Sequence, residues 1–178
     1  MEITDTGFEG LKLIVPGIFR DHRGYFFESF RQEHLVNQDL QHVFIQDNQS
    51  RSTFGVIRGL HFQKDPFAQT KLIRVLEGSI FDVVVDLRNN SSNYGKWYGV
   101  EISDANLHQL LIPKGFAHGF SVLSEHATVF YKCDTYYNAE SEAGIRFDDP
   151  DLQIDWKLDL KSAVISDKDR HLPYLKDL

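Results

Sequence analysis

Short segments that alternate apolar and polar residues, or that are apolar throughout, recur along the chain between turn-forming residues. Segments of this length, rich in Val, Ile, Phe and Tyr, are typical of β-strands. Residues 30–38 and the C-terminal tail favour helices instead. The pattern predicts an all-β sandwich or barrel with short helices at the periphery. We expect strands in residues 11–16, 24–30, 42–50, 55–63, 71–88, 96–103, 108–113, 117–124 and 128–137.

Several of these segments are apolar on both faces of the expected strand. In SIFDVVVDL, residues 79–87, three apolar side chains lie on one face, and Ile80, Asp82 and Val84 lie on the other. An isolated barrel of this size would leave its outer face polar. Burial on both faces therefore indicates two packed sheets, a partner subunit, or both, and we expect a homodimer.

Turn-forming residues and the lack of linkers indicate how the chain is organised. Residues 71–88 favour a β-hairpin, because Glu77-Gly78-Ser79 separates two apolar runs. The chain has no internal repeat, no low-complexity segment and no linker rich in Pro, Gly or Ser. We therefore expect one domain over residues 1–178.

Composition and charge exclude several classes of protein. The net charge of −7 argues against general nucleic-acid binding. Cys133 is the single cysteine, so no internal disulfide can form, which fits a reducing compartment. The N-terminus is acidic and lacks the apolar core of a signal peptide, and no apolar run approaches the roughly 20 residues that span a membrane. We expect a cytoplasmic protein with neither nucleic acid nor membrane as partner.

Five polar residues interrupt otherwise apolar strand faces. A buried ionisable group is costly unless it is paired, and a single one is usually a satisfied core residue. Five on neighbouring strands instead indicate a polar pocket in the barrel. We expect this pocket to be lined by His61, Lys71, Asp82, His118 and Tyr131.

The segment PKGFAH, residues 113–118, is similar to the second half-motif of cupin β-barrels, in which the histidine often binds a metal. Metal-binding cupins typically have His-x-His followed by Glu in the first half-motif, whereas here Gln63 stands two residues after His61. Glutamine is a poor ligand for a transition metal, and the ammonium group of Lys71 would repel a cation. We therefore expect no metal and no other cofactor, with His118 lining the polar pocket instead.

Five long blocks stand in the order and at the spacing of one known family: RGLHFQ (58–63), QTKLIRVLEGSIFDVVVDLR (69–88), LLIPKGFAHGFSVLSE (110–125), YKCDTYYNAESEAGIRFDDPDLQIDW (131–156) and ISDKD (165–169). They resemble dTDP-4-dehydrorhamnose 3,5-epimerase. The resemblance implies a cupin-type jelly-roll, a homodimer and no metal. It also implies inversion of C3 and C5 of dTDP-4-dehydro-6-deoxy-D-glucose to dTDP-4-dehydro-L-rhamnose, in dTDP-L-rhamnose biosynthesis.

The resemblance assigns four residues to the proton-transfer reaction. Epimerisation next to a ketone requires residues of these chemical types. A neutral histidine suits the removal of protons next to a ketone, and His61 matches the family's base. Asp169 matches the carboxylate that partners it, with Asp167 as the nearby alternative. Lys71 resembles the donor to the enolate oxygen, and Tyr131 matches the acid that returns a proton to the opposite face.

The resemblance also assigns residues to the binding of the sugar nucleotide. Arg23 and Arg58 match the cations that hold the diphosphate, for which guanidinium geometry is suited. Tyr137 matches the aromatic ring that stacks on thymine. The remaining binding positions are Glu28, Gln46, Asn48, His118, Glu142 and Lys168.

Two alternatives stay open from the sequence. One is a related enzyme with the same pocket: a nucleotide-sugar 3- or 5-epimerase, or a ketoisomerase. The other is a non-catalytic sugar-binding cupin, which would not need a base, a carboxylate, a lysine and a tyrosine together. The presence of both His61 and Tyr131 argues for acid–base chemistry but does not count the inverted carbons.

Overall fold

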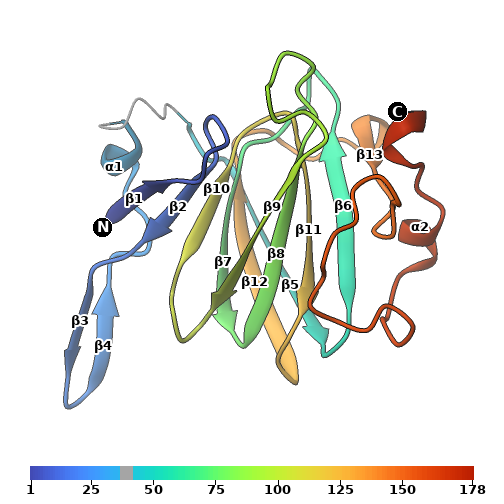
Figure 1. Ribbon diagram of the computed structural model, residues 1–178. Coiled ribbons are helices and arrows are strands. Elements are labelled where there is room, and N and C mark those ends of the chain that lie inside the picture. Colours follow the sequence, from blue (N-terminus) through green and yellow to red (C-terminus); the bar gives the residue numbers. More distant parts are fainter. Residues whose placement is uncertain (37–41) are drawn as a thin grey trace.

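The computed structural model describes residues 1–36 and 42–178, and Figure 1 shows its arrangement. The regular structure of the described residues is mostly β-strand, and each helix among them has five residues or fewer. The elements are β1 (Glu2–Asp5), β2 (Lys12–Val15), β3 (Ile18–Asp21), β4 (Gly24–Phe27), α1 (Gln32–Val36), β5 (Gln46–Thr53), β6 (Ile57–Gln63), β7 (Lys71–Glu77), β8 (Ser79–Asp86), β9 (Trp97–Ser103), β10 (Gln109–Ile112), β11 (Phe116–Val122), β12 (His126–Cys133), η1 (Ala139–Ser141), β13 (Glu142–Gly144), α2 (Asp167–Arg170) and η2 (Leu175–Asp177).

Two antiparallel sheets face each other in the body of the molecule (Figure 1). One sheet has the strand order β1-β2-β10-β7-β12-β5, and the other has the order β13-β6-β11-β8-β9. From β5 to β8 the chain alternates between the sheets, as it does in a jelly-roll. The prediction of an all-β, cupin-type jelly-roll with peripheral helices is confirmed.

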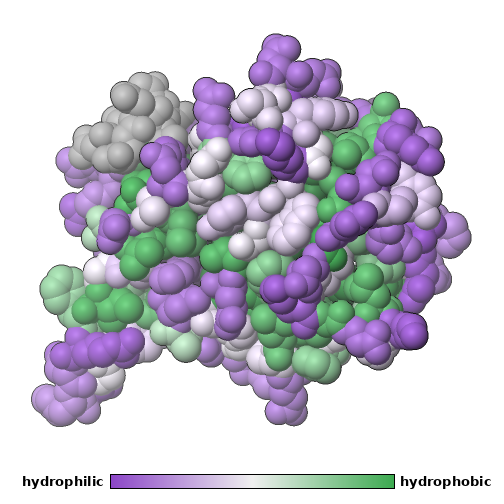
Figure 2. All heavy atoms as spheres, viewed as in Figure 1, coloured by the Kyte–Doolittle hydropathy of each residue, from purple (hydrophilic) through white to green (hydrophobic). Residues whose placement is uncertain are grey.

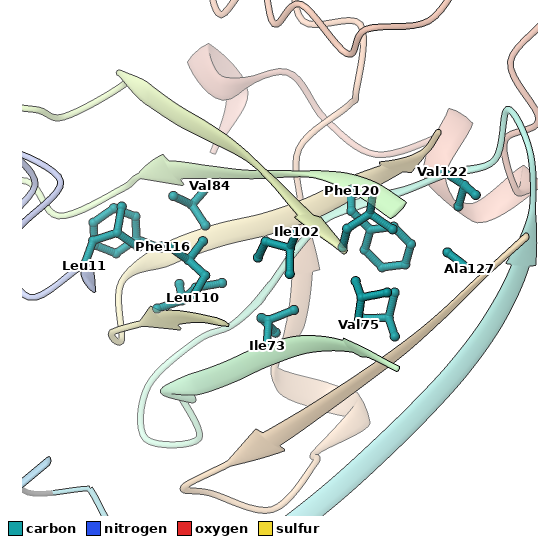
Figure 3. Close-up of a cluster of buried hydrophobic side chains, with 13 residues drawn as sticks. Leu11, Ile73, Val75, Val84, Ile102, Leu110, Phe116, Phe120, Val122 and Ala127 are labelled. Atoms are coloured by element: carbon teal, nitrogen blue, oxygen red, sulfur yellow. The ribbon is translucent and has the colours of Figure 1, made fainter. Parts of the chain in front are cut away.

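The inner faces of the two sheets meet in an apolar core (Figure 3). Ile73 and Val75 of β7 face Val84 of β8 and Phe120 of β11 across this core. Each has an exposed fraction of 5% or less, which places the core between the sheets. Fully burying one such side chain contributes about 1.5–3 kcal/mol to stability.

The outer faces are covered as well, which explains the strands that are apolar on both sides. Phe81 and Val85 on the outer face of β8 pack in one cluster with Trp156 of the C-terminal segment, which runs beside β6 in Figure 1. On the other sheet, Leu72 packs with Leu35 of α1. Of the two explanations for strands that are apolar on both faces, two packed sheets and a partner subunit, the structure thus shows the first.

The predicted hairpin over residues 71–88 is wrong. The turn at Gly78 is present, with φ at +82°, but β7 and β8 belong to different sheets. A side chain at Gly78 would bring its Cβ to 2.1 Å from the carbonyl oxygen of His126, so the corner needs glycine. Two apolar strands joined by a turn can pair, or they can cross between sheets when each has a core face, and here they cross.

The other predicted strands are present with shifted ends. Residues 28–30, 42–45 and 134–137 lie outside strands. Strands β1, β3 and β13 were not predicted, because they lack the run of apolar residues that marks the equally short β2, β4 and β10. The helix predicted over residues 30–38 is α1, and residues 37 and 38 lie outside the described residues. The tail forms α2 and η2. Within the described segments, no helix has the length and apolarity needed to cross a membrane.

Strands β3 and β4 form a separate two-stranded hairpin, which we call the arm. It extends away from the two sheets at the lower left of Figure 1. Phe19 and Phe26 on the arm are each 70% exposed, and hydrophobic residues lie on its surface in Figure 2. Large apolar side chains on a projecting arm indicate a surface that another molecule covers.

Candidate active site

A cavity of about 530 Å³ lies between the two sheets, and a second cavity of about 250 Å³ adjoins it. His61, Lys71 and Tyr131 line both cavities. These residues come from both sheets, because His61 belongs to β6 whereas the other two belong to β7 and β12. The larger cavity is also lined by Arg58, His118, Phe120, Lys168 and Asp169, and the smaller one by Gln46, Asn48, Tyr137 and Glu142.

His61 forms a hydrogen-bonded pair with Asp169. Its Nε2 lies 2.7 Å from Asp169 Oδ1, and the backbone N–H of Gly59 donates to Asp169 Oδ2 at 3.1 Å. The side chain of Ser166 caps the N-terminus of α2 by accepting from the backbone N–H of Asp169. This hydrogen bond holds Asp169 in the first turn of the helix. Because a carboxylate can only accept, His61 Nε2 carries a proton and Nδ1 is left to accept another.

Asp169, and not Asp167, is the carboxylate that contacts His61. The side chain of Asp167 makes no such contact, and its backbone carbonyl accepts from His171 Nδ1 at 2.6 Å. Burial alone would raise the pKa of Asp169, but the hydrogen bonds from His61 and Gly59 hold that pKa below its ordinary value. Asp169 is therefore ionised at neutral pH and can stabilise an imidazolium on His61.

A second histidine–carboxylate pair lies beside the first. His118 stands opposite His61 in the β6–β11 pairing, and its Nε2 lies 2.6 Å from Asp82 Oδ1. His118 lines the larger cavity, but Asp82 is fully buried and lines neither cavity. The prediction that Asp82 lines the pocket is wrong, because its short side chain is engaged by the imidazole of His118 within the core.

The two titratable groups on the opposite sheet have pKa values shifted by burial. Burial lowers the pKa of Lys71, and the carboxylates of Asp82 and Glu142 oppose that shift. Burial raises the pKa of Tyr131, so its phenol is protonated at neutral pH and can donate. Burial also raises the pKa of Cys133 to about 11, which leaves a neutral thiol rather than a nucleophile.

The smaller cavity is bordered by a network of predicted binding residues. The Tyr137 hydroxyl donates to Glu142 Oε2 at 2.9 Å, and Lys168 Nζ lies 2.6 Å from the same oxygen. Gln46 donates to Asn48 Oδ1 at 3.1 Å and accepts from the N–H of Tyr137 at 2.9 Å. The structure thus brings these five side chains together at one edge of the site, with the Tyr137 ring 55% exposed and open to stacking.

The predicted arginines separate into two places. Arg58 lines the larger cavity, and its Nε donates to Ser52 Oγ at 2.9 Å. Arg23 lies on the arm, where its Nη2 is 2.6 Å from Asp21 Oδ2. Glu28 follows the arm, and neither Arg23 nor Glu28 lines the two adjoining cavities, since Arg23 borders a separate hollow of about 490 Å³ on the arm. The structure does not bring these two residues to the site.

Several residues of the larger cavity were missed in the sequence. Phe120 lies two residues after His118 on the same strand face, so alternation was an available signal for it. Val56 and Ser50 also border the cavity. Neither is a polar residue on an otherwise apolar strand face, so the signal that identified His61 and Tyr131 did not identify them. Val164 and Ser166 come from the C-terminal segment, which has no periodic pattern that could place them.

A family model described as dTDP-4-dehydrorhamnose 3,5-epimerase matches residues 5–177. The chain belongs to this family. The dTDP-4-dehydrorhamnose 3,5-epimerase of Methanothermobacter thermautotrophicus is 47% identical over 173 residues, which cover 97% of this chain and 93% of that protein. The crystal structure of the Elizabethkingia anophelis epimerase matches with a TM-score of 0.95 and 47% identity, covering 99% of this chain and 97% of that one. The Legionella pneumophila epimerase, solved in complex with dTDP-4-keto-L-rhamnose, matches with a TM-score of 0.93 and 46% identity, covering 98% and 93% of the two chains.

Exhaustive chelation is expected to leave the turnover of this 3,5-epimerase family member unchanged. Among residues 1–36 and 42–178, no three His, Cys, Asp or Glu side chains are grouped to hold a metal ion. His61 and His118 are instead paired with separate carboxylates, and the ammonium group of Lys71 borders the same cavity. Turnover measured before and after dialysis against EDTA checks this prediction. Loss of activity that one divalent ion restores would contradict it.

Proposed function

We propose that this chain epimerises dTDP-4-dehydro-6-deoxy-D-glucose at C3 and C5 to dTDP-4-dehydro-L-rhamnose, by metal-independent acid–base proton transfer in dTDP-L-rhamnose biosynthesis. One observation carries the proposal: the His61–Asp169 pair and Tyr131 border the same cavity from opposite sheets. An epimerase needs a base and an acid on two faces of one carbon, and this placement supports that requirement.

The base acts on carbons next to the ketone. C3 and C5 of the substrate both adjoin the C4 carbonyl, so removing either proton gives an enolate in which oxygen carries the charge. His61 Nδ1 takes the proton, because Nε2 is occupied by its hydrogen bond to Asp169. The ionised Asp169 orients the ring and stabilises the imidazolium that forms.

The enolate then has to be stabilised and reprotonated. The ammonium group of Lys71 supplies positive charge at the cavity wall, and a donor is most effective where water is excluded. Tyr131 comes from the facing sheet and keeps its proton at neutral pH because burial raises its pKa. It delivers that proton to the face opposite His61, which inverts the carbon.

The thymidine portion of the nucleotide occupies the smaller cavity and its rim, and the diphosphate lies in the larger cavity. Arg58 holds the diphosphate, for which its guanidinium is suited. The half-exposed ring of Tyr137 stacks on thymine, while Gln46, Asn48 and the Glu142–Lys168 pair bind polar edges of the ligand. The adjoining cavities support this division, since they share the residues at which the sugar reacts.

Conversion of the purified 4-keto sugar nucleotide, followed by product configuration in proton NMR, tests the proposed function. We expect the L-configured 4-keto product. A product inverted at C3 or C5 alone would show a single-site epimerase, and migration of the ketone would show a ketoisomerase. Binding without any turnover would show a non-catalytic sugar-binding cupin.

We propose further that residues 1–178 act as one cupin-like epimerase domain within a homodimer in the cytoplasm. Arg23 is a diphosphate-binding position of the family, yet it lies on the projecting arm and lines neither of the two adjoining cavities that hold His61 and Tyr131 in its own chain. The arm exposes Phe19 and Phe26, which a second copy would cover. Arg23 thus acts in the site of the partner subunit. The single cysteine supports a reducing compartment, and the net charge of −7 supports the absence of nucleic-acid partners.

Mixed dimers are expected to recover activity that neither parent variant has. Arg23→Ala leaves each site without an arm arginine, and His61→Asn leaves each site without a base. In a dimer with one subunit of each kind, one site combines an intact His61 with an intact Arg23. We expect about half the wild-type turnover per dimer from two-tag purified mixed dimers, since one of two sites is complete.

The control is Arg51→Ala, which removes an exposed arginine that lines neither cavity and forms an ion pair with Glu77. Dimers in which both subunits carry Arg51→Ala should turn over substrate near the wild-type rate, with no need for a second variant in a mixed dimer. Mixed dimers no more active than the two parents would show that Arg23 does not act across subunits. A monomer at working concentration by light scattering would contradict the dimer.

A further inference from the structure

A buried carboxylate behind the larger cavity is not accounted for by the proton transfers described above. Asp82 on β8 is fully buried, and strand alternation places it on the same inner face as Ile80 and Val84, which belong to the core between the sheets. Its Oδ1 is engaged by His118 Nε2 at 2.6 Å. Its Oδ2 is buried and has no hydrogen-bond partner among the residues described. A half-satisfied carboxylate destabilises a core, so its presence indicates a role other than packing.

The charges that face Lys71 show what this role is. Lys71 projects from β7 in the opposite sheet, and groups from β6, β8, β11, β12 and β13 surround it: His61, Asp82, His118, Tyr131, Cys133 and Glu142. The Cys133 thiol has a pKa of about 11 and is neutral near pH 7. Glu142 is already paired with Lys168 at 2.6 Å. Asp82 is therefore the carboxylate in this set that no lysine or arginine has neutralised.

We infer that Asp82 is a positioning residue for the reaction. Its Oδ1 fixes the imidazole of His118 against the sugar, and its free Oδ2 supplies the buried negative charge against which the Lys71 ammonium is held. Asp82 touches no substrate itself, because it lines neither cavity. Its action runs through His118 and Lys71, which both line the cavity in which the proposed enolate forms. The inference rests on the proposed function.

The direction of the effect follows from the surroundings of Lys71. Burial lowers the pKa of Lys71, and the charge of Asp82 opposes that shift. Without this charge the pKa of Lys71 falls further, so the ammonium form is lost at lower pH as the solution becomes more alkaline. The rate of enolate formation should then begin to decline at lower pH than in the wild type.

The variant Asp82→Asn tests this by removing the charge and keeping the size. Solvent-proton exchange at C3 is the quantity to measure, because exchange through His61 does not require Tyr131 to donate a proton. It is followed between about pH 6 and about pH 10. We expect dTDP affinity within about twofold of wild type and an exchange rate about 10–100-fold lower at neutral pH. We also expect the alkaline decline to move to lower pH. Asp82→Glu keeps the charge and should restore the position of that decline, even where a misplaced His118 keeps the rate low.

The matched control is Asp149→Asn, which alters another buried carboxylate outside both cavities. Asp149 is 2% exposed, and its oxygens accept from backbone N–H groups of Asp151 and Leu175. It should lose stability and leave the pH profile in place. If Asp82→Asn lowers the rate equally at every pH, or if Asp82→Glu shifts the decline as Asp82→Asn does, the inference is overturned.

A measurement on the wild type decides the matter if Asp82→Asn does not fold. Imidazole ¹⁵N NMR should show a proton on Nε2 of His118 throughout the active pH range, since Asp82 can only accept. An unprotonated Nε2 would overturn the inference. Failure of the proposed function is distinguishable, because it would appear as a wild-type protein that exchanges no protons at any pH.

Discussion

Replacing His61 with asparagine is expected to remove nearly all proton exchange at both C3 and C5. His61 is the cavity residue whose Nδ1 is left to accept a proton, because its Nε2 is held 2.7 Å from Asp169. Asparagine keeps a polar side chain of similar size and has no basic nitrogen. A general base contributes about 10²–10⁴-fold, so exchange should fall by that factor. The measurement is deuterium wash-in at each carbon by NMR.

Binding should survive this change, because the proposed nucleotide contacts lie in the smaller cavity and at Arg58. Asp169→Asn is the second variant, for which we expect a smaller loss of exchange. It leaves His61 in place but removes the carboxylate that orients it, so it should slow exchange without abolishing binding. Wild-type exchange in His61→Asn would place the base elsewhere.

Replacing Tyr131 with phenylalanine is expected to separate exchange from inversion. The change keeps the ring and its packing and removes the hydroxyl, whose pKa burial raises. His61 approaches from the other sheet and should still remove protons and return them to the same face. We expect dTDP binding and exchange to persist, while inversion at C5 falls by about 10²–10⁴-fold. Deuterium content and product configuration, measured on one sample, report the two quantities separately.

The phenylalanine variant has a built-in comparison in Tyr137→Phe. Tyr137 also carries a hydroxyl, but that group is bonded to Glu142 at the rim of the smaller cavity. Its loss should weaken nucleotide binding more than inversion. Should Tyr131→Phe form L-configured product as fast as wild type, its hydroxyl would be structural, and water or another side chain would be the acid.

Strand alternation predicted four of the side chains that share the cavity. His61, Lys71, His118 and Tyr131 each interrupt an apolar strand face, and the structure brings all four to one cavity. The same rule failed for Asp82, because alternation gives the face of a strand and not the depth of a side chain along it. Its burial depends on the neighbouring imidazole of His118, which comes from another strand.

Connections between elements were less accessible from the sequence. The turn at Gly78 is visible in the chain, but nothing local distinguishes a hairpin from a crossing to the facing sheet. The pairing of Asp169 with His61 spans 108 positions and could be predicted only through resemblance to the family. Arg23 was likewise predicted as a binding position through the resemblance alone, while its place on a projecting arm became visible only in three dimensions.

Incubation of the wild-type protein with dTDP-4-dehydro-6-deoxy-D-glucose in deuterated water tests the central claim most directly. If His61 and Tyr131 act as base and acid across the cavity, both C3 and C5 acquire solvent deuterium and the product has the L configuration. A product that lacks deuterium at C3 and C5, or that retains the original configuration at either carbon, would contradict this account.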